Sequence, residues 1–221
     1  MNKILILLLL FSQFLSCSKP INSREFYFNA TEFKPSKTYK YQSLNDSSKV
    51  ELWIISNTNK NEILTVRKNE KGKQIDKLKE VITENGAKLK SYSISFFEND
   101  WIDAIKFYPI KDELFKWDLS DKATYSGQFY YDNLYWNLSR IREFVEKTQI
   151  KYNNDYYETL VFKDTYKYNV FENQPSKINV SKPFFQNFIQ YSYFSYHVGL
   201  VKYERFYEDG NKESWKLVEI L

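Results

Sequence analysis

The chain has very few of the residues on which common catalytic and metal sites depend. Its 221 residues include one cysteine, Cys17, and one histidine, His197, together with five glycines. A lone cysteine cannot form an internal disulfide, and one histidine with one cysteine cannot make the usual zinc sites. No glycine-rich phosphate-binding loop is present. These absences predict a protein with no metal and no cofactor.

An excess of charge of one sign is also missing. The chain has 32 Lys and Arg against 28 Asp and Glu, a formal net charge of +4, and the two signs are interspersed along the sequence. A nucleic-acid-binding protein usually presents a clustered basic face. We therefore expect no nucleic-acid partner.

Aromatic residues, in contrast, are abundant. Phe, Tyr and Trp make up 19% of the chain, with 19 Tyr and 18 Phe, while Gly and Pro number five each. Disordered chains have few aromatics, and aromatic side chains suit the half-buried surface of a β-sheet. This composition predicts a folded, strand-rich domain.

The first 16 residues have the pattern of a secretory signal peptide. Lys3 precedes an apolar run from Ile4 to Leu10, and Ser12 and Gln13 interrupt the oily segment soon afterwards. A membrane-spanning helix needs about 20 apolar residues, so the run is too short to cross a bilayer. A charged start, a short apolar stretch and a small residue before the break are typical of a cleaved leader.

The leader ends with Phe14, Leu15 and Ser16, and Cys17 follows. The four residues together resemble the lipobox of bacterial lipoproteins, in which the leader is cut just before the cysteine. Phe14 stands where that pattern usually has Leu. The resemblance implies that Cys17 receives acyl chains and anchors the protein to a membrane outside the cytoplasm, and two or three chains would hold it firmly. An ordinary secreted protein with a chance cysteine is the alternative. Inner-membrane retention signals have aspartate directly after the cysteine, whereas this chain has Ser18, so the outer membrane is favoured by analogy.

Residues 17–36 are expected to form a lipidated tether, with an edge strand at Glu25 to Asn29 as an option, and residues 37–221 a single β domain. Within it, Asn85 and Gly86 predict a type I′ hairpin that pairs Thr83 with Lys88. A helix beginning near Lys73 is the competing interpretation, because apolar residues there also follow helical spacing.

Residues 133–146 leave two structures open. Leu134, Leu138, Ile141 and Val145 fall at helical spacing, whereas Ile141, Glu143 and Val145 alternate as in a strand. About ten antiparallel strands in one domain predict a mainly β fold. We expect a single curved antiparallel sheet, half-barrel, barrel or sandwich-like, with at most one or two short helices.

Two C-terminal segments, Ile150 to Phe162 and Tyr193 to Glu204, together resemble the C-terminal half of bacterial envelope lipoproteins whose curved antiparallel sheets are similar to the half-barrel lipoprotein carriers. The resemblance implies a fold and an envelope location. It brings no catalytic residue with it.

His197 is the obvious candidate for catalysis, but no nucleophile-elbow motif accompanies it, and we interpret it as a packed strand residue. Glu98, Asp100 and Asp103 could supply paired carboxylates for glycoside hydrolysis, although a solvated turn explains them equally simply.

Calcium is a further option at the C-terminal turn, where Asp209, Asn211 and Glu213 alternate as oxygen ligands do. Ser214, however, occupies the position where a calcium loop needs glycine. A three-residue hairpin loop of Asp209, Gly210 and Asn211 accounts for the same residues.

Two clusters of aromatic residues remain. They can form the core and its rim, line an apolar pocket for a lipid, or offer a flat surface for a sugar or a protein. The first cluster comprises Tyr130, Tyr131, Tyr135 and Trp136, and the second comprises Tyr191, Tyr193, Phe194 and Tyr196.

The sequence thus predicts a lipid-anchored envelope protein without enzymatic activity and with a binding or structural role. Its partners would be the membrane, through Cys17, and a hydrophobic small molecule, a glycan or an envelope protein on the curved sheet. A lipid or lipoprotein carrier with a closed apolar cavity, an envelope hydrolase and a glycan-binding module are the alternatives.

Overall fold

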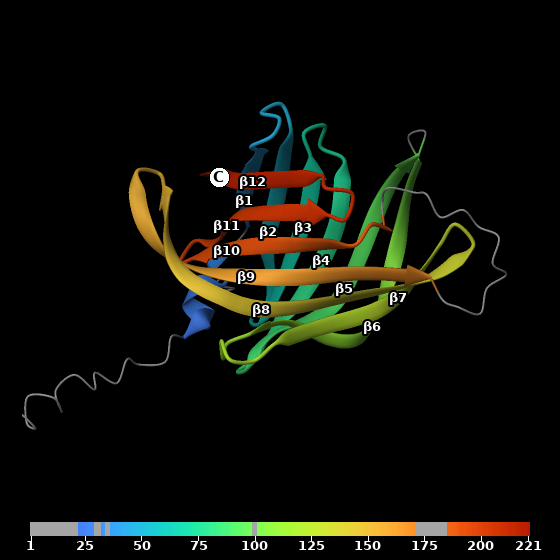
Figure 1. Ribbon diagram of the computed structural model, residues 1–221, viewed down its shortest axis with the longest axis horizontal. Coiled ribbons are helices and arrows are strands. Elements are labelled where there is room, and N and C mark those ends of the chain that lie inside the picture. Colours follow the sequence, from blue (N-terminus) through green and yellow to red (C-terminus); the bar gives the residue numbers. More distant parts are fainter. Residues whose placement is uncertain (1–21, 29–31, 34–35, 99–100, 171–184) are drawn as a thin grey trace, which may run out of the picture.

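The computed structural model describes residues 22–28, 32–33, 36–98, 101–170 and 185–221, without the side chains of 96–98 and 101–104. Within these ranges, antiparallel strands form a closed barrel in the order β1-β12-β11-β10-β9-β8-β7-β6-β5-β4-β3-β2 (Figure 1). The strands are β1 (Lys37–Ser43), β2 (Val50–Asn59), β3 (Glu62–Asn69), β4 (Gln74–Ile82), β5 (Gly86–Glu98), β6 (Trp101–Lys116), β7 (Ala123–Tyr131), β8 (Leu134–Tyr152), β9 (Asp155–Val170), β10 (Phe188–Ser195), β11 (Gly199–Tyr207) and β12 (Lys212–Ile220).

Closure of the barrel corrects the predicted fold class. β1 pairs with β12, so that Tyr39 lies opposite Ile220 and Ser43 opposite Trp215. The mainly β character and the antiparallel pairing are confirmed, but the single curved sheet with free edges, in half-barrel or sandwich form, is wrong. The reason is physical: the first and last strands of an open sheet would expose unpaired N–H and C=O groups, and their mutual pairing satisfies both edges.

The described residues contain no α-helix, and the one helical element with several residues is the 3₁₀ turn η2 (Ser23–Phe26). Residues 133–146, for which a helix was an option, belong to β8. No helix among the described residues is long and apolar enough to span a lipid bilayer.

Two hairpins use asparagine-rich turns in the left-handed region. Asp132 and Asn133 connect β7 to β8 with φ of 54° and 62°, and Asn153 and Asn154 connect β8 to β9 with φ of 47° and 70°. Two consecutive positive φ values define the type I′ turn, which matches the twist of the strands on either side.

The hairpin between β4 and β5 is confirmed, but its predicted register is wrong by two residues. The Thr83 N–H donates to the Gly86 carbonyl at 2.8 Å, and Ile82 lies opposite Ala87. Gly86 is required because the backbones of β5 and β6 approach closely there, and not because its φ is positive. A β-carbon at this position would lie 1.9 Å from the carbonyl oxygen of Phe115 on β6.

The last hairpin has the predicted loop length at a different place. The Tyr207 N–H donates to the Asn211 carbonyl at 3.0 Å, so the loop is residues 208–210. Gly210 has the left-handed φ of 84°. Moving the loop by one residue shifts the pairing of β11 with β12 by two residues, which keeps every side chain on its own face of the sheet. The inward and outward pattern is therefore unaffected.

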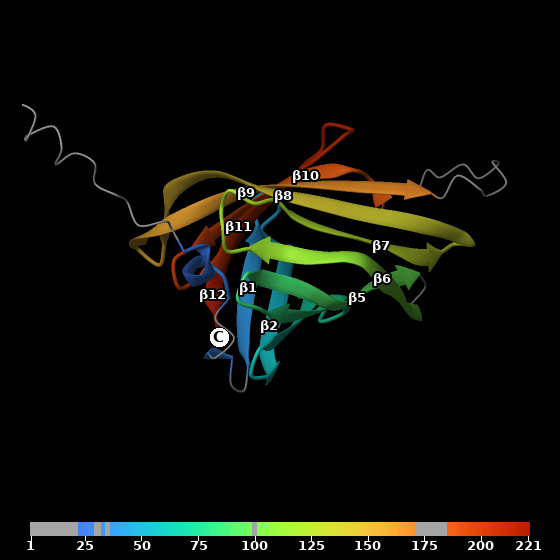
Figure 2. The same cartoon turned by 90° about the horizontal axis from the view of Figure 1, so that it is seen from below.

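One end of the barrel is closed by residues 22–28, which we call the N-terminal plug (Figures 1 and 2). The Ser23 hydroxyl donates to the Trp117 carbonyl at 2.7 Å, and the His197 N–H donates to the Glu25 carbonyl at 2.9 Å. Phe26, Tyr27 and Phe28 of the plug are buried. Residues that the sequence placed in the tether thus form part of the core, and the turn η2 replaces the edge strand considered there.

Aromatic rings fill the barrel interior next to the plug. Phe115 lies 4.8 Å from Phe162 and 5.4 Å from Phe194 between ring centroids, and Tyr27 reaches both Phe115 and Phe194 at 4.8 and 5.8 Å. This packed end leaves the rest of the interior to a different set of side chains.

Candidate functional site: the barrel lumen

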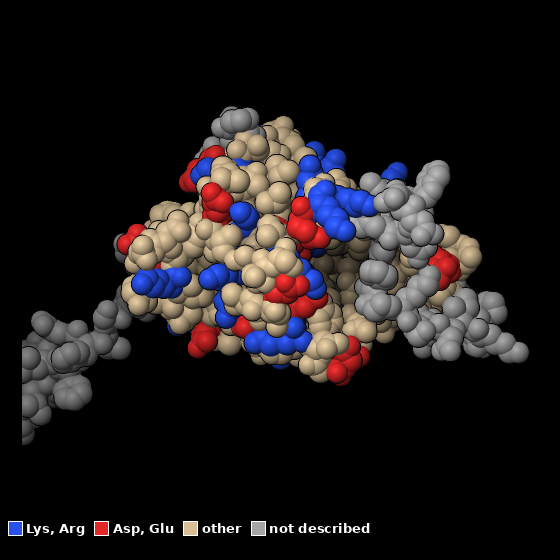
Figure 3. Space-filling model, turned by 90° about the horizontal axis from the view of Figure 1, so that it is seen from above, with Lys and Arg blue, Asp and Glu red and all other residues tan. Residues whose placement is uncertain are grey.

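A cavity of about 750 Å³ occupies the barrel interior beyond the packed aromatic end. The walls come from most of the strands, and Tyr27 and Phe28 of the plug form its floor. Barrels of eight strands are just filled by their own side chains, and wider ones leave internal space. Seen from above, the surface of the molecule is hollowed beside a group of charged side chains (Figure 3). We call this cavity the lumen.

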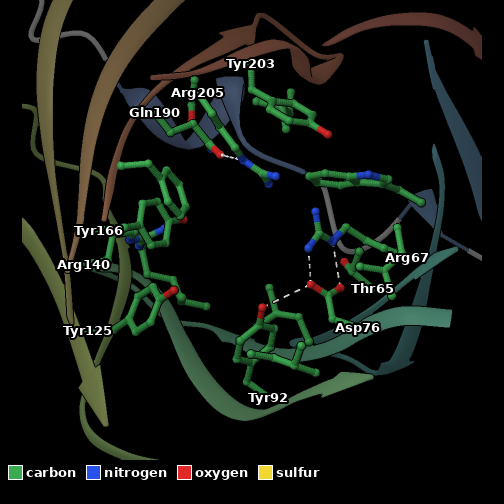
Figure 4. A pocket seen from close by; sticks show the side chains of 18 of the residues that line it. Thr65, Arg67, Asp76, Tyr92, Tyr125, Arg140, Tyr166, Gln190, Tyr203 and Arg205 are labelled. Atoms are coloured by element: carbon green, nitrogen blue, oxygen red, sulfur yellow. Dashed lines mark hydrogen bonds and ion pairs between the residues drawn. The ribbon is translucent and has the colours of Figure 1, made fainter. Parts of the chain in front are cut away.

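Arg67, on β3, projects into the lumen from one wall (Figure 4). Its Nε donates to Asp76 Oδ1 at 2.8 Å, its Nη2 also bonds the Asp76 carboxylate, and Glu51 Oε2 lies 3.6 Å from Nη1. The guanidinium stands 5.2 Å from the centroid of the Trp53 ring. Tyr92 donates to Asp76 at 3.1 Å. Two carboxylates therefore compensate the charge of Arg67.

Arg205, on β11, projects into the same space from another wall (Figure 4). Its Nε donates to the neutral Gln190 amide oxygen at 2.9 Å. Among the described residues its only ion-pair partner is Glu213, at 3.5 Å, and that side chain is 47% exposed. The guanidinium lies 5.1 Å from the ring of Tyr203 and 5.5 Å from that of Phe188. Arg205 thus has aromatic neighbours, and among the described residues no buried carboxylate forms an ion pair with it.

A third cationic centre lies deeper in the barrel. Arg142 binds Asp164 through two parallel hydrogen bonds of 2.7 and 2.9 Å, and Arg140 Nε lies 3.7 Å from the same carboxylate. Although burial alone raises the pKa of Asp164, the two arginines hold it below its usual range. Arg140 Nη2 donates to the Leu114 carbonyl, whereas its buried Nε has no hydrogen-bond partner among the described residues.

Hydrogen bonds connect this deep centre to Arg205. Gln190 Nε2 donates to the Ser192 hydroxyl at 2.9 Å, and that hydroxyl donates to Asp164 at 2.8 Å. Ser192 and Asp164 are fully buried. Gln190 is therefore held at both ends of its amide, which fixes the oxygen that accepts from Arg205.

Glu80 is a buried carboxyl at the floor of the lumen. It accepts a hydrogen bond from the hydroxyl of Tyr27 in the plug. Burial raises the pKa of Glu80 to about 7, although the Tyr27 hydrogen bond and the charges of Arg140 and Arg142 act in the opposite direction. Near neutral pH this carboxyl is therefore partly protonated.

The residues that the sequence singled out for chemistry lie elsewhere. His197 is exposed in the turn between β10 and β11, with φ of 57°, and its ring is 3.9 Å from Tyr196. It is a turn residue and not the strand residue we predicted. Glu98, Asp100 and Asp103 have side chains outside the described residues, and Cys17 lies outside them altogether.

The candidate calcium ligands serve the C-terminal hairpin. Asn211 donates twice to the carboxylate of Asp209, at 2.9 and 2.7 Å. Glu213 accepts from the Tyr207 hydroxyl at 3.0 Å and lines the lumen. Where side chains are described, no group of three or more His, Cys, Asp and Glu is placed to hold a metal.

The two aromatic clusters are divided between the faces of the barrel. Tyr130 and Tyr135 are about half exposed on the outside, and their rings contact each other in a tilted arrangement with centroids 4.9 Å apart. Trp136 is buried, and Phe194 lines the lumen. The sequence clusters therefore do not act as units, because neighbours in a strand point to opposite faces.

Sequence reasoning missed the lumen arginines altogether. A usable signal was present: Tyr203, Arg205 and Tyr207 occupy alternate positions of one strand, as do Arg140 and Arg142 in another. A charged residue at an inward position of a strand is unusual and marks a polar interior.

No protein-family model matches the sequence, and no curated protein matches it significantly. Two crystal structures are similar in shape. One is a candidate lipoprotein of Parabacteroides distasonis, 13% identical, with a TM-score of 0.49, covering 89% of this chain and 98% of its own. The other is a candidate exported protein of Bacteroides fragilis with a YmcC-like fold, 11% identical, with a TM-score of 0.49, covering 85% of this chain and 96% of its own.

Proposed function

We propose that this chain is an envelope protein, anchored through Cys17, that binds an amphipathic small molecule in its lumen and does not act as an enzyme. The observation that carries the proposal is the lumen itself, whose volume of about 750 Å³ lies in the range of small-molecule sites. The leader and the cysteine at its end support the location.

The walls of the lumen favour an amphipathic ligand over a purely apolar one. Aromatic rings such as Trp53, Tyr92 and Phe188 supply apolar contact, while Arg67 and Arg205 supply charge. A carrier for acyl chains alone would need an apolar cavity, because an acyl chain would leave charged groups desolvated and unpaired. The lumen therefore fits a molecule with both an apolar body and polar groups.

The plug gives the lumen a defined orientation toward the proposed anchor. Cys17 precedes Asn22, the first described residue of the plug, by five positions, and five residues span at most about 18 Å. The floor of the lumen would accordingly lie toward the membrane. A ligand would enter from the end at which Tyr207 and Glu213 stand.

Native mass spectrometry of the full chain purified from membranes tests the proposal. We expect a non-covalently bound small molecule on the wild type. Thr65, which is 5% exposed and lines the lumen, provides a filling variant: Thr65→Trp should lose the bound mass. Thr124→Trp, at an outward position beside the lumen residue Tyr125, is the matched control and should keep it. A wild-type chain that carries no ligand and binds none of the ten-carbon probes decanoate, decyl phosphate and decanol would overturn the proposal.

A further inference from the structure

We propose that Arg205 and Arg67 together bind an anionic oxygen group, a carboxylate or a phosphate, at one end of the lumen ligand. The inference rests on the proposed function, because it names the chemical group that the lumen recognises. It concerns the upper part of the lumen, away from the plug.

The two guanidinium groups face one space from different walls. Arg67 comes from β3 and Arg205 from β11, and Figure 4 shows both pointing into the cavity. Burial and repulsion from Arg67 act to lower the pKa of Arg205, and the charge of Glu51 acts to raise it. Both side chains are mostly buried, with exposures of 16% and 20%. Two cations in one partly desolvated space are unfavourable unless negative charge lies between or beside them.

The available negative charge is unevenly shared. Asp76 and Glu51 both form ion pairs with Arg67, whereas Arg205 contacts a neutral amide and the half-exposed Glu213, and Glu51 acts on it only from beyond ion-pair distance. Arg205 is therefore the cation whose charge an incoming anion would neutralise. The planar fork of a guanidinium matches the two oxygens of a carboxylate or phosphate. On Arg205, Gln190 accepts from Nε, and the half-exposed Glu213 lies 3.5 Å from Nη1, where an anion in the lumen could replace it.

Aromatic faces flank the two arginines and constrain the rest of the ligand. The rings of Trp53 and Tyr203 are 5.9 Å apart, and each stacks against one of the guanidinium groups. An anionic group placed between the arginines would have these rings on its flank. The atoms attached to it would then meet apolar surface, so the ligand is an amphipathic anion.

Calorimetric titration of the full chain with three probes of equal chain length tests the inference. The probes are decanoate, decyl phosphate and decanol, which share one tail and differ in the head group. We expect at least one anion to bind roughly tenfold to a hundredfold more tightly than decanol, in line with hydrogen bonds to charged groups. The tighter anion distinguishes a carboxylate from a phosphate ligand.

Arg205→Gln should remove this preference, reducing the affinity for the anion to about that of decanol. Arg205→Lys keeps the positive charge but lacks the planar fork, so it should lose part of the preference for the anion. This variant supplies the comparison if Arg205→Gln does not fold. Lys202→Gln is the matched control, because Lys202 lies on the same strand and its ammonium pairs with Glu204 and not with a lumen residue. This variant should bind the anion as the wild type does.

Two results would count against different claims. If decanol binds as tightly as both anions, or if Arg205→Gln leaves the anion affinity unchanged, the anionic site is wrong while lumen binding stands. If none of the three probes binds to the wild type and no ligand co-purifies with it, the proposed function itself fails.

Discussion

Arg142 and Asp164 face each other inside the barrel and join β8 to β9 through two hydrogen bonds of 2.7 and 2.9 Å. Both side chains are almost fully buried, with exposures of 8% and 0%. Arg140 lies 3.7 Å from the same carboxylate. One buried anion therefore compensates two buried cations, and the hydrogen bonds through Ser192 and Gln190 extend from it to the upper lumen.

Asp164→Asn should strongly destabilise the fold. Removal of one partner of a buried ion pair leaves an uncompensated charge and costs about 3 to 5 kcal/mol, and here two arginines lose their partner. Urea denaturation measures the change in the free energy of unfolding. Glu158→Gln, also on β9, is the control: its pair with Lys147, at 2.8 Å, is about half exposed and should contribute about 1 kcal/mol or less. A loss below 1 kcal/mol for Asp164→Asn would show that the pair does not hold these strands together.

Glu80 should make the stability depend on pH between about 5 and 8. Burial raises its pKa to about 7 from a usual value of 4.5, so the folded chain holds a proton that the unfolded chain has already released. The unfolded state then binds fewer protons, and the free energy of unfolding falls as pH rises through this window. At 1.36 kcal/mol for each unit, the loss would be at most about 3 kcal/mol.

Glu80→Gln should abolish most of this dependence, since its amide is neutral at every pH and its oxygen can still accept from Tyr27. The variant is expected to be more stable than the wild type at pH 8. Glu204→Gln is the control, because the pKa of Glu204 is lowered to about 2 by its lysine and tyrosine partners despite its burial, and its effect falls in acid below the window. Equal slopes for wild type and Glu80→Gln in denaturation at pH 5 and pH 8 would refute the assignment.

Gly86→Ala should destabilise the barrel where β5 passes β6. The added β-carbon would lie 1.9 Å from the carbonyl oxygen of Phe115, and overpacking of this kind costs about 1 to 3 kcal/mol or more. Gly72→Ala is the control: its β-carbon would meet nothing within 4 Å, although its φ of 75° carries strain of about 1 to 2 kcal/mol. Thermal melting should rank Gly86→Ala below Gly72→Ala. The reverse order would mean that β6 moves to accommodate the methyl group.

Local patterns in the sequence predicted part of the local structure. Turn residues located the hairpin between β4 and β5 and the hairpin between β11 and β12, although the exact pairing of each differs from the prediction. In β8, Leu134 and Leu138 are buried while Ile141 and Val145 are 43% and 48% exposed. The apparent helical spacing therefore arose because apolar residues occupy both faces of one strand, and only the three-dimensional environment separates them.

Those patterns left the shape of the sheet open and did not specify its closure or the lumen. Tyr39 and Ile220 pair across nearly the whole chain, and no local signal specifies such a contact. The same holds for Arg67 and Arg205, which come from strands far apart in sequence and share a space only because the sheet closes. Of the shapes that the sequence left open, a half-barrel with free edges would have left no enclosed lumen.

Cys17→Ser tests the anchor, the most specific prediction that the sequence alone makes. If Cys17 carries acyl chains, the wild type should incorporate a fatty-acid label and sediment with membranes, because two or three buried chains hold a protein firmly where one does not. The serine variant has no thiol to acylate, so it should lose the label and appear in the soluble extracytoplasmic fraction. Phe14→Leu restores the usual lipobox residue and serves as the control, with labelling equal to or above that of the wild type. An unlabelled wild type would overturn the lipoprotein assignment and, with it, the orientation of the plugged floor toward a membrane, while binding in the lumen would be unaffected.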